Sequence, residues 1–72
     1  MSKRTKKPGD FVIRDETLAW CWEDCDGTRE VYYDQFIEDP LSGRSVNENV
    51  RNADRFAAWL VRAAAWCREA NR

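Results

Sequence analysis

The sequence predicts an α+β fold in which a small antiparallel sheet packs on one long C-terminal amphipathic helix, in the order ββα or βββα. Two strand-like aromatic runs surround an Asp-Gly pair within residues 17–38, and this pattern is typical of a β-hairpin. Residues 46–70 contain no Gly or Pro and repeat apolar side chains at intervals of three and four, as an amphipathic helix does. We therefore expect one small domain over residues 10–72, preceded by a disordered basic tail over residues 1–9.

The first ordered segment is expected at Phe11–Ile13, a short run with high β-propensity. A polar break at Asp15-Glu16 follows it. If this run pairs with the hairpin, the sheet has three strands and the order is βββα; otherwise the order is ββα.

The hairpin turn is expected at Asp26-Gly27, because a two-residue primed turn needs positive φ at both central positions. A four-residue loop closed by Asp24 and Arg29 gives the same register. The pairs that follow are Cys25–Thr28, Asp24–Arg29, Glu23–Glu30, Trp22–Val31 and Trp20–Tyr33. The like-charged pair of glutamates would cost stability, which suggests that the charge is useful to the protein.

This register divides the side chains between two faces of the sheet. The face expected to form the core carries Leu18, Trp20, Trp22, Val31, Tyr33 and Ile37. The face expected to be solvated and acidic carries Thr17, Ala19, Cys21, Glu23, Glu30, Tyr32, Asp34 and Phe36.

The helix is expected to begin after a turn at residues 39–44. Ser45 and Glu48 have the spacing of a capping box, so we expect a helix from about Val46 to Ala70, roughly 37 Å long. The alternatives are a kink in this helix or a later start near Asn52. Its core-facing residues would be Phe56, Trp59, Leu60, Ala63, Cys67 and Ala70, with Trp66 at their edge. One hairpin cannot cover that length, so the surplus is solvated, kinked or buried in a partner, and a homodimer through this helix would bury it.

The composition excludes several classes of site. A chain of 72 residues lies near the lower limit for independent folding, and its nine aromatic residues are expected to supply dense packing. With three Cys and no His, the chain can form neither a mixed Cys/His zinc site nor a site of four cysteine thiolates. The acidic residues around Gly27 do not have the spacing of a calcium-binding loop. We expect no metal and no cofactor.

The sequence also predicts a non-enzymatic protein. There is no His to activate a cysteine, and the glycine-rich phosphate loops and nucleophile motifs are absent. No apolar run approaches the length that spans a membrane, and the odd number of cysteines favours free thiols in the cytoplasm.

Charge is unevenly distributed along the chain. Ten of the thirteen acidic residues lie between Asp10 and Asp39 with only two basic ones, so this segment has a formal charge of −8 while the whole chain has −1. Opposed blocks of charge indicate interaction surfaces. We therefore expect a protein-binding module, an inhibitor or modulator that occludes a basic partner protein such as a nucleic-acid-handling complex, of the kind that phages and mobile elements encode. The residues expected to bind the partner are Glu23, Asp24, Asp26, Glu30, Tyr32, Asp34 and Phe36.

The alternative is a small nucleic-acid-binding regulator, because basic residues occur in the tail and along one edge of the expected helix. Its phosphate contacts would be Lys3, Arg4, Lys6, Lys7, Arg51, Arg55 and Arg62. A third hypothesis is a structural subunit whose aromatic sheet face is an obligate interface, which predicts concentration-dependent melting.

Overall fold

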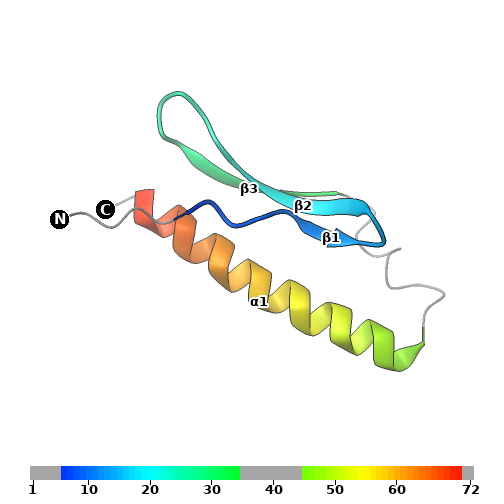
Figure 1. Cartoon of the computed structure of the whole chain (residues 1–72). Coiled ribbons are helices and arrows are strands. Elements are labelled where there is room, and N and C mark those ends of the chain that lie inside the picture. Colours follow the sequence, from blue (N-terminus) through cyan, green and yellow to red (C-terminus); the bar gives the residue numbers. More distant parts are fainter. Residues whose placement is uncertain (1–5, 35–44, 71–72) are drawn as a thin grey trace.

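The computed structural model describes residues 6–34 and 45–70, and these form three strands followed by one helix (Figure 1). The strands are β1 (Phe11–Ile13), β2 (Glu16–Glu23) and β3 (Arg29–Tyr33), and the helix is α1 (Val46–Ala70). The chain therefore has the predicted α+β architecture in its βββα form, including the short first strand.

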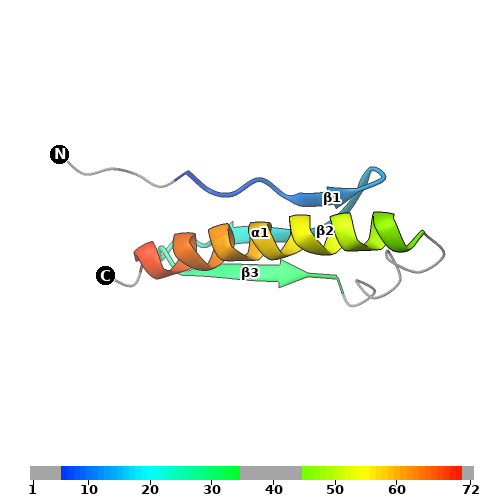
Figure 2. The same cartoon turned by 90° about the horizontal axis from the view of Figure 1, so that it is seen from below.

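The three strands form one antiparallel sheet in the order β1-β2-β3. Helix α1 lies along one face of this sheet, and in Figure 2 it runs in front of β2 between the two edge strands. The opposite face of the sheet carries no helix or strand among the described residues.

A two-residue turn joins β1 to β2. Ile13 pairs with Glu16, and both intervening residues, Arg14 and Asp15, have positive φ angles of 50° and 66°. These are the backbone signs of a primed hairpin turn, in which Asp15 is a residue type that tolerates positive φ and Arg14 is not. The sequence showed this segment only as a polar break.

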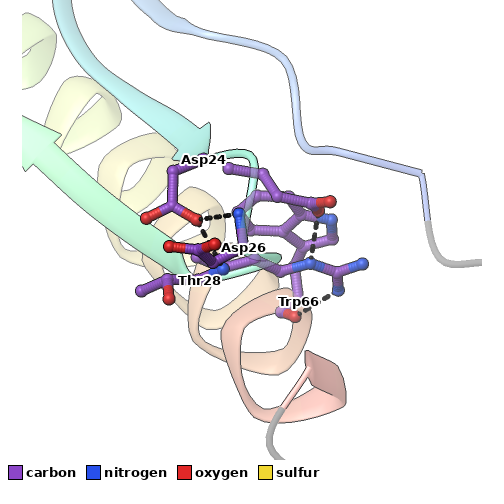
Figure 3. Close-up of polar contacts among 6 residues, drawn as sticks. Asp24, Asp26, Thr28 and Trp66 are labelled. Atoms are coloured by element: carbon purple, nitrogen blue, oxygen red, sulfur yellow. Dashed lines mark hydrogen bonds and ion pairs between the residues drawn. The ribbon is translucent and has the colours of Figure 1, made fainter.

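The loop between β2 and β3 has three residues instead of the predicted two or four. The amide of Asp24 donates to the carbonyl of Thr28 at 3.0 Å, and the Asp24 carboxylate accepts the amides of Asp26 and Thr28, each at 2.9 Å (Figure 3). Only Gly27 has positive φ in this loop, at 85°. A three-residue loop with glycine in the left-handed region is the next most common hairpin connection after the two-residue turns.

This loop moves the β2–β3 register by one residue from the prediction, which is wrong on this point. The observed pairs are Ala19–Tyr33, Trp20–Tyr32, Cys21–Val31, Trp22–Glu30 and Glu23–Arg29. Because side chains alternate along a strand, β3 keeps its predicted faces while the β2 residues 19–23 exchange theirs. Trp20 and Trp22 therefore point away from the helix, and Ala19 and Cys21 point toward it with no exposed surface.

Strand β2 contains a β-bulge at Leu18, where its pairing with β1 shifts by one residue. The partner of Phe11 is Ala19, but the partner of Val12 is Thr17, so Leu18 is an extra residue on β2. A bulge interrupts the alternation of faces, and this explains how Leu18 and Ala19 are both buried although they are adjacent. The Leu18 carbonyl accepts the amide of Asp34 at 2.8 Å.

The core lies between the inner sheet face and one side of α1. Its buried members are Phe11, Ile13, Leu18, Ala19, Cys21, Trp59, Ala63 and Trp66, with Val31, Phe56 and Cys67 packed against them. Trp66, predicted at the edge, is thus central, whereas Leu60 and Ala70 are exposed. Tyr33 is on the inner face but 61% exposed because it lies at the end of an edge strand. The predicted core residue Ile37 lies outside the described residues.

Helix α1 has the predicted limits. The Ser45 hydroxyl accepts the amide of Glu48 at 3.2 Å, which is one of the two bonds of a capping box. Before β1, residues 6–10 form neither helix nor strand, but the carbonyl of Gly9 accepts a hydrogen bond from the indole of Trp59. This contact ties the chain to the helix just before the sheet begins.

Candidate protein-binding surface

The sheet face that α1 does not cover carries a cluster of aromatic side chains around one carboxylate. We call this surface, formed by Val12, Trp20, Trp22, Glu30 and Tyr32, the outer face. Trp22 is 53% exposed, Tyr32 41% and Val12 37%. Exposed apolar side chains that gather on one face are a mark of interaction sites.

Two of the rings are held against each other. Trp20 and Tyr32 face each other across β2 and β3, and their rings stack with centroids 5.7 Å apart and planes 16° from parallel. Such cross-strand aromatic pairs stabilise a sheet and restrict the rotamers of both rings. Trp20 and Tyr32 therefore hold each other in place on the outer face.

Glu30 is the carboxylate of the outer face. It lies directly opposite Trp22, and its carboxylate accepts a hydrogen bond from the hydroxyl of Tyr32. This bond raises the pKa of Tyr32 above its ordinary value, and the negative charge of Glu30 acts in the same direction. A carboxylate thus stands between two aromatic rings on an exposed surface.

The other acidic residues predicted to bind a partner are arranged differently. Asp24 and Asp26 lie in the β2–β3 loop, where Asp24 uses its carboxylate to hold the turn and Asp26 is exposed. Asp34 follows the far end of β3 and is half-buried, and Phe36 lies outside the described residues. The predicted surface is therefore brought together only in part, at Glu30 and Tyr32.

Glu23 faces the helix side of the sheet and takes part in a structural contact. Its carboxylate accepts the Nε–H of Arg29 at 2.8 Å, in place of the predicted like-charged pair with Glu30. The Arg29 guanidinium also lies 4.5 Å from the centroid of the Trp66 ring and donates to the Trp66 carbonyl at 2.8 Å (Figure 3). The Glu23–Arg29 pair thus joins the hairpin to the C-terminal half of α1.

The basic residues of the alternative hypothesis do not form one uniform surface. The guanidinium of Arg55 lies 5.5 Å from the centroid of the Phe11 ring and donates to the Val12 carbonyl at 3.4 Å. Arg51 lines an open pocket with Ile13, Arg14, Glu48 and Asn52. Arg62, Lys6 and Lys7 are exposed, and Lys3 and Arg4 lie outside the described residues.

Sequence reasoning missed the two tryptophans of the outer face. Trp20 and Trp22 were expected in the core because the two-residue turn placed them there. The signal that could have found them is the Asp24–Thr28 spacing: an aspartate four residues before a threonine, with Gly27 between them, suits a three-residue loop.

Within residues 6–34 and 45–70, no group of His, Cys, Asp and Glu side chains is arranged to hold a metal ion. No helix in the described part of the chain is long and apolar enough to cross a membrane. Comparison with known proteins found no matching family, no matching curated protein and no matching solved structure.

Proposed function

We propose that this protein is a small non-enzymatic binding module whose outer face docks on a basic protein surface and occludes it. The observation that carries the proposal is the cluster around the Glu30 carboxylate, in which Trp22 and Tyr32 are exposed and Trp20 is half-buried. Tryptophan, tyrosine and arginine dominate the binding energy of protein interfaces, so these rings are suitable anchors.

The chemistry of the cluster favours an arginine-bearing partner. A guanidinium next to Glu30 would form a charge-assisted hydrogen bond with its carboxylate, in competition with the Tyr32 hydroxyl. The same group could stack on the exposed Trp22 ring, which contributes about 0.5–1 kcal/mol at a solvated site. The segment from Asp10 to Asp39, to which this face belongs, has a formal charge of −8 and would raise the rate of encounter with a cationic surface.

A partner that binds nucleic acid has the required basic surface, so we propose an inhibitor or modulator of a nucleic-acid-handling complex, encoded by a phage or mobile element. We place it in the cytoplasm as part of the same proposal. The three free thiols support that location, because a reducing compartment keeps cysteines unpaired.

The experiment compares the wild-type protein with two outer-face variants, Trp22→Ala and Glu30→Arg, as immobilised baits in extracts of the native host. A basic protein retained by the wild type and lost with both variants supports the proposal, provided that its binding weakens with salt. The control is Glu69→Arg, which makes the same charge change on α1, outside the outer face, and should retain the partner. Retention by Glu30→Arg that equals the wild type overturns the proposal.

The alternative function, direct nucleic-acid binding, is favoured by the pocket where Arg14 and Arg51 meet beside β1. A mobility-shift assay at low salt separates the two functions. The protein-binding proposal predicts no shift with DNA or RNA alone, whereas nucleic-acid binding predicts a shift that Arg51→Glu reduces.

A further inference from the structure

The side of α1 that faces away from the sheet carries a second set of apolar residues. We call this set, formed by Val46, Val50, Ala53, Ala57, Leu60, Val61 and Ala64, the helix seam. Val46 is 77% exposed, Val61 68%, Val50 53% and Leu60 36%. A solvated helix face normally carries polar side chains, so this face needs an explanation.

The spacing of the seam is that of helix-to-helix packing. Residues 46, 50, 53, 57, 60 and 64 follow one another at alternating steps of four and three, and no charged residue occurs among them. This repeat is the pattern of a coiled-coil interface. It is separate from the core, because Ala57 lies about 160° around the helix from Trp59. The seam therefore fits another helix and not this chain's own sheet.

Two charges border the seam on one side, and they have opposite signs. Asp54 lies beside its N-terminal half and Arg68 beside its C-terminal half, about 40° apart around the helix axis. In an antiparallel pair of these helices, each Asp54 would approach Arg68 of the other copy. In a parallel pair, each Asp54 would instead lie level with Asp54 of the other copy, and each Arg68 with Arg68. The two charges that border the seam are thus complementary between copies only when the helices pair antiparallel.

We propose that a second copy of this chain docks antiparallel on the helix seam, forming a two-fold dimer. Ala57 of one copy lies level with Leu60 of the other, and Ala53 with Ala64, so that small residues face equal or larger ones. Side chains on a helix lean toward its N-terminus, and this lean brings Arg68 back toward Asp54 of the other copy. Because the sheet already holds α1 as a helix, pairing does not bear the cost of helix nucleation.

The dimer is independent of the proposed partner-binding function, since the seam and the outer face belong to different elements. The formal net charge of one chain is −1, so electrostatic repulsion between two copies is small. Two-fold pairing would also place two outer faces in one assembly.

The test is sedimentation equilibrium of the full chain from micromolar to millimolar concentration, with two matched variants. Ala57→Glu places a charge in the middle of the seam and should raise the dimer dissociation constant on the order of 100-fold, because each dimer would bury two unpaired carboxylates. Ala58→Glu makes the same substitution one residue away, at an exposed position off the seam, and should leave dissociation unchanged. Circular dichroism checks that both variants fold.

A charge exchange tests the orientation. Asp54→Arg alone and Arg68→Asp alone should each weaken the dimer, and the double variant should restore it. A monomeric wild type at every concentration overturns the proposal. So does a dimer that survives Ala57→Glu, or one that Trp22→Ala abolishes, since the interface would then lie elsewhere. Failure of the double variant to recover would overturn the antiparallel arrangement.

Discussion

Arg29 connects the hairpin to the helix, and its removal should show how much of the fold depends on that contact. In the variant Arg29→Met the aliphatic packing is kept while three interactions are lost. The hydrogen bond from the guanidinium to the Trp66 carbonyl, at 2.8 Å and partly buried, is worth about 1.5 kcal/mol because its donor is charged. The contact with the Trp66 ring adds about 0.5–1 kcal/mol, and the half-exposed ion pair with Glu23 about 0.5 kcal/mol.

The expected loss is therefore about 2.5–3 kcal/mol of unfolding free energy, a large share of the stability of so short a chain. Urea unfolding followed by far-ultraviolet circular dichroism measures it directly, and the midpoint should fall by about 1–2 M. Glu23→Gln isolates the ion pair and should cost less than about 1 kcal/mol.

The control is Arg62→Met, which removes an exposed arginine from the same helix without touching the core. It should change the free energy of unfolding by no more than about 0.5 kcal/mol, as a surface substitution does. If Arg29→Met and Arg62→Met are equally stable, the contact between Arg29 and Trp66 does not hold the hairpin on the helix.

Three further predictions concern the turn, the helix start and pH. Asp15→Gly should stabilise the protein by about 1 kcal/mol in thermal melts, because glycine adopts the positive φ of 66° without steric cost; a lower melting temperature would contradict this. Ser45→Ala should cost about 1 kcal/mol in urea unfolding, since the amide of Glu48 loses its acceptor, whereas Ser45→Asp should restore it. Burial, with a smaller effect from the neighbouring Cys67, raises the pKa of Cys21 above 9.0. The folded state therefore holds this proton more tightly than the unfolded chain, and the associated stability is complete below about pH 9 and lost as pH rises through the folded pKa. Unfolding free energies measured across that range should fall, and less steeply in Cys21→Ala.

The sequence predicted the fold well where the pattern extends over many residues. The limits of α1 follow from an uninterrupted apolar repeat and a serine at its start, and the structure places them at Val46 and Ala70. The two hairpin strands follow from β-prone runs on either side of an Asp-Gly pair, whereas Phe11–Ile13 was expected as a third strand in only one of the two alternatives. Such patterns are repeated several times within one element, so that single exceptions do not change the prediction.

The sheet faces depended on one residue of loop length, and there the sequence prediction was wrong. Asp26-Gly27 suits a two-residue turn, but the Asp24 carboxylate binds two amides of the loop and fixes a three-residue connection. The bulge at Leu18 adds a second shift that no local propensity indicates. The candidate site was accordingly half predicted: Glu30 and Tyr32 lie where expected, whereas Trp20 and Trp22 joined them from the predicted core.

The distribution of the four tryptophans has an optical consequence. Trp59 and Trp66 are each 2% exposed, whereas on the outer face Trp22 is 53% exposed and Trp20 is half-buried against Tyr32. The intrinsic fluorescence of the protein should therefore combine blue-shifted emission from Trp59 and Trp66, which are shielded from aqueous quenchers, with red-shifted emission from Trp22, which is accessible to them. A ligand on the sheet and a loosening of the interior would change different parts of the emission spectrum. The chain thus contains two separate natural probes, one for its surface and one for its core.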